Sequence, residues 1–337
     1  MARHVQFDEI GGPEVLTVRE VELRAPGPGE ARIRVDAIGL NRAEVMFRSG
    51  GYFLRPTFPS GLGAEAAGVV EELGPDVTGF APGDRVGVVP AFPQNLYGTY
   101  GDHVIVPAHA LVPAPAGLDP VAGAAVWMAY LTAYGALAEN SPVLPGDHVL
   151  ITAASSSVGL AAIQTVRHLG AVPIATTRGE AKRKALLAAG AEHVIVTDRE
   201  DLPARVAAIT GGRGVRLAFD PVAGPGVNTL ARAVAPGGQL VVYGRLDPRP
   251  TPLPNADEYP ALSTRTYTLF EVTSDPERLR RGVAFVTAGL RSGSLAPVVD
   301  RTFDLADIAE AHRYMEANSH VGKIVVTVPH QVVPGDR

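Results

Sequence analysis

The sequence predicts an α/β fold with two domains, a doubly wound parallel sheet and a mostly β, barrel-like domain. The chain has 337 residues, which is more than one hydrophobic core usually supports. Up to about Pro120, short β-like runs are separated by Gly and Pro, as in a compact β barrel. From Val121 onward, strand-like runs alternate with helical runs, which is typical of βαβ units and a parallel sheet.

The composition excludes several classes of protein. With 46% hydrophobic and 19% charged residues, the chain can bury sizeable cores and is not disordered. A formal net charge of −5 gives no electrostatic attraction for nucleic acid. There are no cysteines, which excludes disulfides, Cys-ligated zinc and thiol nucleophiles. We therefore expect a cytoplasmic protein with no nucleic-acid partner.

One segment needs comparison with a membrane span, because residues 121–138 carry no charge. The segment is short for a span and rich in Ala, it contains Thr132 and two tyrosines, and no second candidate accompanies it. The first residues, MARHVQFDEIGGPE, have no apolar core and include early acids, unlike a signal peptide. We expect a buried helix and no membrane partner.

The predicted barrel-like domain is discontinuous in sequence. Its strand-like runs before residue 122 are ARIRVDAIGL, AAGVVEELG, DRVGVVP and HVIVPAHALVPAP. After Arg291 the chain has one strand-like run, the helical run IAEAHRYMEAN and a closing strand KIVVTVP, too short to form a domain. The expected division is therefore residues 1–122 with 294–337 for the first domain and 123–293 for the second.

The second domain shows six strand-like runs, with a helical run between most of them. The runs are HVLITA, VPIATT, HVIVT, VRLAFD, QLVVYG and TYTLFE. A Pro-rich loop, residues 248–260, separates the fifth run from the sixth. Six such strands fit a complete dinucleotide-binding sheet.

The turn after the first of these strands is poor in glycine. A dinucleotide turn usually reads G-x-G-x-x-G, whereas AASSSVG keeps only Gly159, which we assign to close helix–strand packing. Ser156 and Ser157 replace glycines, and their hydroxyls can donate to phosphate oxygens. The turn from Ser156 through Val158 to Gly159 is thus a candidate cofactor site, and an ordinary strand-to-helix turn is the alternative.

The end of the second strand indicates which coenzyme is bound. An NAD site usually carries Asp or Glu about 20 residues past the turn, whereas Arg accommodates a 2′-phosphate. This chain has Thr177 and Arg178 there, with Lys182 shortly after and no acid at the strand end. The pattern predicts NADPH; the alternative is a solvated helix start, where cations are otherwise unfavourable.

The quoted segments, taken together, resemble a known family over almost the whole chain. The most specific pieces are GPEVLTVREVELRAPGPGEARIRVDAIGLNRAEVMFRSGGY, GAEAAGVVEELGPDVTGFAPGDRV, AASSSVGLAAIQTVRHLGA and HVGKIVVTVP. They are similar to the zinc-independent quinone oxidoreductase branch of the medium-chain dehydrogenase/reductase superfamily. The resemblance implies a Rossmann sheet with a GroES-like domain. The family turn is commonly AASGGVG or AAAGGVG, so the serines here are a departure.

The same resemblance implies that zinc is absent. Zinc-dependent relatives place Cys where this chain has Asn41, and His where it has Ala64, immediately before Glu65. Their four-cysteine loop is also missing. His103 and His109 show no paired spacing, so we expect no metal site.

The resemblance also suggests catalytic residues. Tyr52 matches a tyrosine that lines the active site of quinone reductases and is a proposed proton donor in related polyketide enoyl reductases; packing under the nucleotide is the alternative. Asn41 matches a pocket asparagine near the nicotinamide. Lys182 aligns with a lysine that is also a proposed proton donor in those enoyl reductases. That role competes with its predicted role in binding the 2′-phosphate. Tyr97 and Tyr100 are expected to shape the substrate pocket.

Four further cofactor contacts are carried over by position, each of which also has an ordinary structural explanation. They are Thr132, Gly244, Phe270 at the end of the sixth strand, and Lys323. Asp220 follows a central strand and precedes Pro221, so we expect it to cap the following turn rather than to act as a base.

We therefore predict an NADPH-dependent, zinc-independent reductase that transfers hydride to quinones or α,β-unsaturated carbonyl compounds. One alternative is an enoyl reductase acting on a polyketide or acyl thioester. An alternative of another class is a weakly catalytic nucleotide-binding protein. The family suggests a homodimer.

Overall fold

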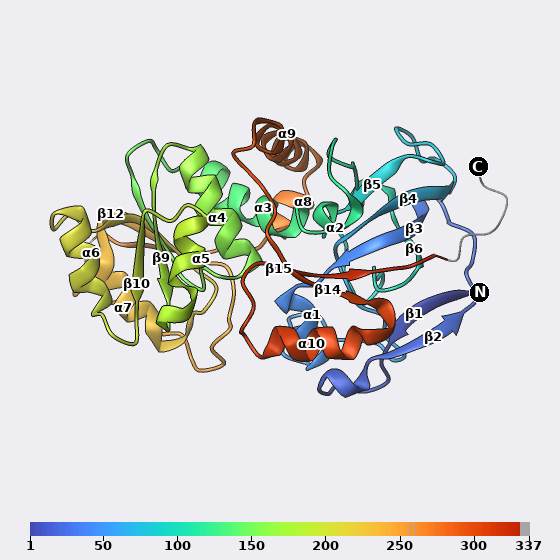
Figure 1. Ribbon diagram of the computed structural model, residues 1–337, viewed down its shortest axis with the longest axis horizontal. Helices are drawn as coiled ribbons and strands as arrows, with labels where there is room; N and C mark the ends of the chain where they lie inside the picture. Colours follow the sequence, from blue (N-terminus) through green and yellow to red (C-terminus); the bar gives the residue numbers. More distant parts are fainter. Residues whose placement is uncertain (256, 260, 331–337) are drawn as a thin grey trace. The chain divides into compact units, whose positions relative to one another are not determined.

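The computed structural model describes residues 1–255, 257–259 and 261–330, and it divides the chain into two compact units (Figure 1). Unit 1 comprises Met1–Met128, Thr273–Leu279 and the chain from Pro297; unit 2 comprises Ala129–Val272 and Arg280–Ala296. The first boundary lies after the expected residue 122. The Met128 N–H donates to the Glu65 carboxylate at 2.9 Å, which ties the preceding residues to unit 1.

The segment Thr273–Leu279 is a second difference from the expected division, which assigned it to the other domain. The buried Thr273 hydroxyl donates to the Pro90 carbonyl at 2.8 Å. A side-chain bond over 183 positions is not visible in a local sequence pattern.

Unit 1 contains a seven-stranded sheet in the order β14-β15-β3-β4-β5-β7, with β6 paired to β3. All its pairings are antiparallel except β14 with β15. Its long strand β3 alternates buried and half-buried residues, so one face packs into the core. The strands are β3 (Glu30–Gly39), β4 (Ala66–Leu73), β5 (Arg85–Val88), β6 (His103–Pro107), β7 (Leu111–Pro113), β14 (Val299–Asp304) and β15 (Lys323–Thr327).

The remaining elements of unit 1 are short. A two-stranded antiparallel sheet joins β1 to β2. These elements are β1 (Ala2–Gln6), η1 (Pro13–Val15), β2 (Thr17–Val21), α1 (Arg42–Arg48), η2 (Ala108–Ala110), α2 (Pro120–Gly123), η6 (Leu305–Asp307) and α10 (Ile308–Glu316). Because β15 pairs with β3, the C-terminal strand–helix–strand completes the first unit, as the sequence predicts.

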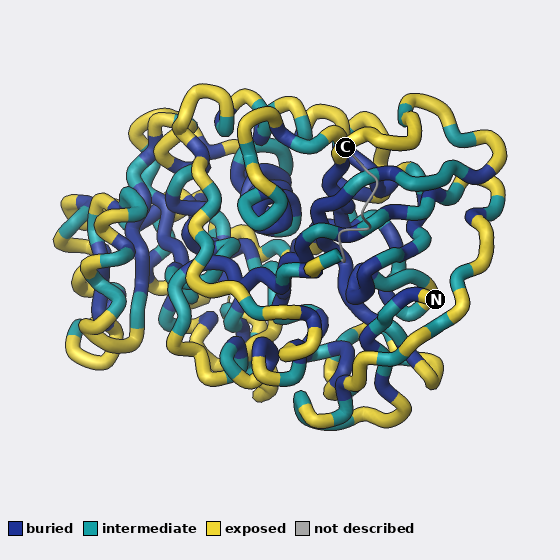
Figure 2. The backbone as a smooth tube through the Cα atoms, turned by 45° about the vertical axis from the view of Figure 1, so that its right-hand side comes forward, coloured by how far each residue is buried: buried dark blue, intermediate teal, exposed yellow. Residues whose placement is uncertain are grey.

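Unit 2 contains a six-stranded, wholly parallel sheet in the order β10-β9-β8-β11-β12-β13. Numbered from its first strand, this is the 3-2-1-4-5-6 order of the Rossmann fold, which confirms the predicted fold class. The strands are β8 (His148–Ile151), β9 (Val172–Thr177), β10 (His193–Val196), β11 (Val215–Asp220), β12 (Val234–Val242) and β13 (Ser263–Thr266). The four strands β8 to β11 are buried over most of their length, whereas the edge strand β13 has no buried residue (Figure 2).

Helices connect the strands of unit 2, and two further helices contain residues of both units. Those of unit 2 are η3 (Gly135–Asn140), α4 (Ser157–His168), η4 (Glu180–Lys182), α5 (Arg183–Ala188), α6 (Leu202–Thr210), η5 (Gly224–Gly226), α7 (Val227–Ala233) and α8 (Phe270–Thr273), whose last residue belongs to unit 1. The helices shared by both units are α3 (Trp127–Tyr134) and α9 (Pro276–Ser292).

The sixth strand differs from the prediction. The expected run TYTLFE begins where β13 ends, and the strand itself is the less apolar Ser263–Thr266. Pairing continues for one further residue, since the Tyr267 N–H donates to the Val242 carbonyl at 2.9 Å. Phe270 therefore begins the short helix α8 rather than ending a strand. β13 is an edge strand, which pairs on one side only, and none of its residues is buried. Its sequence therefore has little of the apolar pattern by which a strand is predicted.

The uncharged segment is a buried helix, as predicted. The helical stretch Pro120–Asn140 is long and apolar enough to cross a membrane, but 78% of its most apolar window is buried inside the structure. Its small residues allow close packing, since Gly135 lies against the Tyr267 ring and leaves no room for a Cβ atom.

Candidate active site

The turn after β8 leads directly into α4, where a pyrophosphate is predicted. Ala153 has a φ of 44°, a left-handed conformation that an L-residue adopts at some cost. Ser156 is the N-cap of α4, and its Oγ accepts from the Gly159 N–H at 3.1 Å. An accepting hydroxyl keeps its own hydrogen, so Ser156 can still donate outward. Ser157 and Val158 form the first, half-buried turn of α4.

Gly159 holds the helix close to the strand, as the sequence predicts. A Cβ atom there would lie 2.6 Å from backbone atoms of Ala154, closer than any real contact. Gly159 therefore brings the start of α4 against the strand end, which is one of the separate roles of glycine in dinucleotide turns.

The two predicted basic residues lie differently. Arg178 directly follows β9 and is exposed, and the Thr177 hydroxyl donates to the Gly179 carbonyl at 3.1 Å. Lys182 ends η4 and is half-buried, and its Nζ donates to Ser155 Oγ at 3.1 Å. The structure thus brings Lys182 to the turn after β8. The neighbouring acid, Glu180, lies 3.6 Å from Arg183.

The two central strand ends of unit 2 are joined by side chains. The Thr152 hydroxyl donates to the Asp220 carboxylate, linking β8 to β11. The strand order reverses between these two strands, the switch point where ligands of such folds bind. Asp220 also accepts from the Ala223 N–H at 2.6 Å, which confirms its predicted turn-capping role. Burial raises the pKa of this carboxyl above its usual value.

Of the other carried-over contacts of unit 2, Gly244 has a clear packing role. A Cβ atom on Gly244 would lie 2.7 Å from the Pro221 carbonyl oxygen, so the chain passes close to the turn after β11. Thr132 is buried in α3, and Phe270 is half-buried in α8. Their roles as cofactor contacts stay predictions.

Unit 1 brings Asn41 and Lys323 together in a buried polar cluster with Glu44 and Glu65. Lys323, at the start of β15, is 1% exposed, and its Nζ lies 2.6 Å from Asn41 Oδ1 and 2.5 Å from Glu65 Oε2. Neither carboxylate is exposed to solvent. A buried ammonium needs such a partner, because an unpaired charge in the interior is very costly.

The sequence explains why Asn41 sits where it does. It is the N-cap of α1, and its backbone N–H donates to the Glu44 carboxylate, as in a capping box. The Glu44 N–H donates to the backbone carbonyl of Asn41 at 3.2 Å, and the Asn41 side chain makes no cap hydrogen bond. Burial raises the pKa of Glu44 to about 8, and the charge of Lys323 opposes that rise. The pattern N-x-x-E was available in the sequence as a sign of this contact, whereas the contact with Lys323, 282 positions away, was not.

Tyr52 lies in the loop after α1. Its N–H donates to the Met46 carbonyl at 3.0 Å, and its ring packs against the unit 1 core, 4.3 Å from the Phe53 ring. Burial raises the pKa of the phenol to about 12, and the nearby charge of Glu44 adds to that rise. Tyr52 therefore carries its proton at any ordinary pH.

Two expected pocket tyrosines are engaged elsewhere. The Tyr97 hydroxyl donates to Glu30 at 2.8 Å, and the Tyr100 hydroxyl lies 3.2 Å from His312 Nε2. Tyr100 is buried in the core of unit 1. Both phenols thus make structural contacts that their sequence positions did not indicate.

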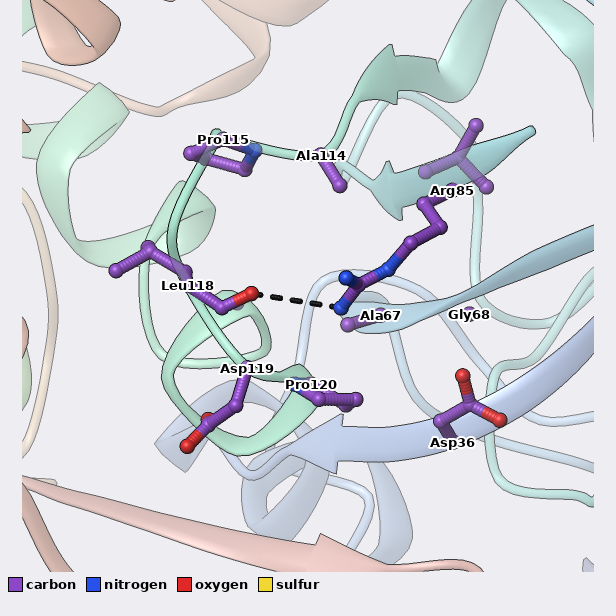
Figure 3. A pocket seen from close by; sticks show the side chains of 11 residues that line it. Asp36, Ala67, Gly68, Arg85, Ala114, Pro115, Leu118, Asp119 and Pro120 are labelled. Carbon is purple, nitrogen blue, oxygen red and sulfur yellow. Dashed lines mark hydrogen bonds between the residues drawn. The ribbon is translucent and has the colours of Figure 1, made fainter.

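Unit 1 also has a small surface pocket beside Arg85, bounded by β3, β4 and the segment 114–123 (Figure 3). Arg85 donates to the Leu118 carbonyl at 3.4 Å across it, and Asp36 and Asp119 lie at its rim. None of the predicted site residues lines this pocket.

Among the described residues, no group of three or more His, Cys, Asp or Glu side chains could hold a metal ion. His103 contacts Asp102 at 3.1 Å and Glu71 at 3.3 Å, and His109 contacts the Ala91 carbonyl at 3.1 Å.

Comparisons with known proteins agree with this architecture. Residues 27–116 match the family described as alcohol dehydrogenase GroES-like domain, and residues 189–326 match the family described as zinc-binding dehydrogenase. The quinone oxidoreductase of Pseudomonas aeruginosa is 33% identical over 97% of this chain and 99% of its own length. The 2-haloacrylate reductase of a Burkholderia species is 32% identical over 94% of this chain and 96% of its own length.

Among solved structures, Escherichia coli quinone oxidoreductase complexed with NADPH has a TM-score of 0.90 and 29% identity, covering 96% of this chain and 99% of that one. The fold and these relatives define a medium-chain dehydrogenase/reductase, an oxidoreductase. Within that superfamily the chain belongs to the zinc-independent quinone oxidoreductase branch.

Proposed function

We propose that this protein is an NADPH-dependent reductase that transfers hydride to quinones or to α,β-unsaturated carbonyl compounds. The observation that carries the proposal is Lys182, whose ammonium lies 3.1 Å from Ser155 in the turn after β8, with Arg178 at the end of β9. Two cations at this position suit the 2′-phosphate that distinguishes NADPH from NADH.

The turn itself fits a dinucleotide. The 12-residue helix α4 begins there and offers backbone N–H groups and a positive dipole end. Gly159 lets the start of α4 pack against the turn, and the Ser156 hydroxyl is placed at the helix start. These residues would hold the pyrophosphate, while Arg178 and Lys182 would hold the 2′-phosphate.

When bound, NADPH supplies the hydride, and the protein supplies binding and orientation. Reduction of a quinone ends in a stabilised hydroquinone anion, whereas reduction of an enone leaves an enolate that needs a proton. The Tyr52 phenol, with its pKa raised to about 12, keeps its proton until a strong base forms beside it. We therefore assign Tyr52 as the donor for enones.

The names of the relatives favour both substrate classes. One is a quinone oxidoreductase and the other reduces a 2-haloacrylate, an α,β-unsaturated acid. The same assay tests the alternative function, an enoyl reductase acting on an acyl thioester, because an enoyl thioester is its third acceptor. A homodimer and a cytoplasmic location stay predictions. Size-exclusion chromatography with light scattering checks the homodimer.

The deciding experiment compares turnover on a quinone, a small enone and an enoyl thioester, with NADPH and with NADH. We expect NADPH oxidation with a quinone or an enone. Tyr52→Phe should lower enone turnover by about 10²-fold, the usual lower bound for general acid catalysis, and leave quinone turnover nearly unchanged. Equal losses on both acceptors would remove the donor assignment. NADPH binding without turnover on any acceptor would leave a nucleotide-binding protein.

A further inference from the structure

The orientation of the Asn41 amide is determined by two neighbours of fixed chemistry. Lys323 has only hydrogens to donate, and its Nζ lies 2.6 Å from one end of the amide. The Gly39 carbonyl can only accept, and it lies 3.0 Å from the other end. The oxygen of Asn41 must therefore face Lys323 and the nitrogen must face Gly39.

The amide nitrogen of Asn41 has no hydrogen left for a ligand. Three acceptors surround it, the Gly39 carbonyl at 3.0 Å, Glu44 Oε1 at 3.3 Å and Glu65 Oε2 at 3.4 Å. An NH₂ group has two hydrogens, so these acceptors use both. The oxygen accepts from Lys323 and has a second lone pair. Toward any bound molecule, Asn41 can therefore only accept.

Lys323 is held too firmly for the amide to turn. Its partner Glu65 is fixed in turn by the Met128 N–H at 2.9 Å. A Cβ atom on Gly39 would lie 2.8 Å from both Lys323 Cε and Glu65 Oε2, so the backbone of β3 packs directly on the ion pair. Turning the Asn41 amide would set its NH₂ group against the ammonium and its oxygen against the Gly39 carbonyl.

We propose that Lys323 is a positioning residue that keeps Asn41 as a hydrogen-bond acceptor, and that Asn41 binds a hydroxyl or N–H group rather than polarising a substrate carbonyl. The inference rests on the proposed function, and it takes from the family resemblance that Asn41 lies near the nicotinamide. It reassigns Lys323 from cofactor contact to support. The donor that Asn41 accepts from belongs either to the coenzyme or to the reducible substrate.

The test of Lys323 uses a charge-neutral pair of substitutions. Lys323→Met alone leaves Glu65 buried without its cation, so we expect a large fall in Tm. Lys323→Met with Glu65→Gln removes both charges, and most of the Tm should return. If Lys323 orients Asn41, kcat in this double variant should stay about two- to tenfold low, the effect of losing one oriented hydrogen bond.

A spectroscopic readout separates positioning from stability. In ¹⁵N-labelled protein the side-chain NH₂ signals of Asn41, assigned by their loss in Asn41→Ala, should shift and exchange faster in the double variant. Restored Tm with unchanged kcat and unchanged Asn41 signals would overturn the role of Lys323. Because this readout needs no turnover, it stays informative if the wild-type chain reduces no acceptor, the outcome that overturns the proposed function instead.

The acceptor role of Asn41 is tested by Asn41→Ala. A weaker Kd for NADPH with an unchanged KM for quinone assigns the bound donor to the coenzyme, and the reverse assigns it to the substrate. Either result shows that Asn41 contacts the bound molecule before the reaction, as an acceptor from a hydroxyl or N–H group would. If Kd and KM are unchanged while kcat falls about 10²- to 10³-fold on quinone and enone alike, as when a donor to a developing oxyanion is lost, the proposal is wrong.

Discussion

The polar residues of the two units are used in opposite ways. In unit 1, Lys323, Glu65 and Asn41 are buried and bonded to one another, with their charges compensated inside the protein. In unit 2, Arg178 and Lys182 lie at or near the surface, at a strand end and a turn. The comparison teaches that the buried charges of unit 1 fix one another's geometry, whereas the two cations of unit 2 lie where we propose that a coenzyme is recognised.

The largest effect should come from breaking the buried pair. Glu65→Ala leaves the Lys323 ammonium without its anion, which should cost about 3–5 kcal/mol of unfolding free energy. Chemical denaturation measures it. Arg183→Ala, which removes partly exposed ion pairs with Glu180 at 3.6 Å and Glu200 at 3.8 Å, is the control and should cost less than about 1 kcal/mol. Equal losses would contradict the contrast between buried and exposed charges.

The next effect concerns the coenzyme. Arg178→Ala and Lys182→Ala should each weaken NADPH binding about tenfold to a hundredfold, because a charge-assisted bond contributes roughly 1.5–3 kcal/mol. NADH, which lacks the 2′-phosphate, should bind each variant as it binds the wild type. Titration of both coenzymes by fluorescence measures these constants, and Lys184→Ala, which changes an exposed lysine two residues after Lys182, serves as control. A parallel loss for NADH would remove the 2′-phosphate assignment.

A smaller effect is expected where the turn of unit 2 packs on its helix. Gly159→Ala places a methyl group 2.6 Å from Ala154, which should cost about 1–3 kcal/mol as overpacking. Thermal unfolding measures the loss. Gly179→Ala, at a position with nothing within 4 Å and no left-handed φ, should change Tm little. A tolerated Gly159→Ala would show that α4 can move away from the turn.

The last effect is a change in the pH dependence of stability. The folded pKa of Glu44, about 8, lies above its ordinary 4.5, so the native state binds this proton more tightly than the unfolded state. Its contribution is complete below about pH 4.5 and is lost as the pH rises to about 8. Glu44→Gln, which keeps the capping-box pattern, should flatten that decline in unfolding free energy. A variant whose stability declines with pH as steeply as the wild type would contradict the assignment.

The two units also differ in how much of them the sequence predicts. The sheet of unit 2, the capping role of Asp220 and the packing role of Gly159 follow from local patterns and were predicted correctly. The sixth strand was misplaced, because Ser263–Thr266 is an edge strand with little apolar signal. The Pro-rich stretch 248–260 includes residues 256 and 260, which lie outside the described residues.

In unit 1 the site residues were proposed from a family resemblance, and their contacts could not be predicted. Asn41 meets Lys323 only because β15 pairs with β3, a pairing of segments nearly 300 residues apart. The capping contact of Glu44, three residues from Asn41, was within reach of the sequence. The sequence analysis named Glu65 only as the residue next to the missing zinc ligand at Ala64. Its ion pair with Lys323 could not be predicted, because the fold brings the two residues together.

The late position of β15 bears on how the protein is made. A ribosome releases the first 128 residues long before Lys323 is translated, so until then Glu65 has no ammonium to meet and β3 lacks a neighbour in its sheet. The continuous stretch that supplies most of unit 2 is available earlier. The nascent chain should therefore be able to form unit 2 first, and the cluster of Asn41, Glu65 and Lys323 should assemble only after β15 has been translated.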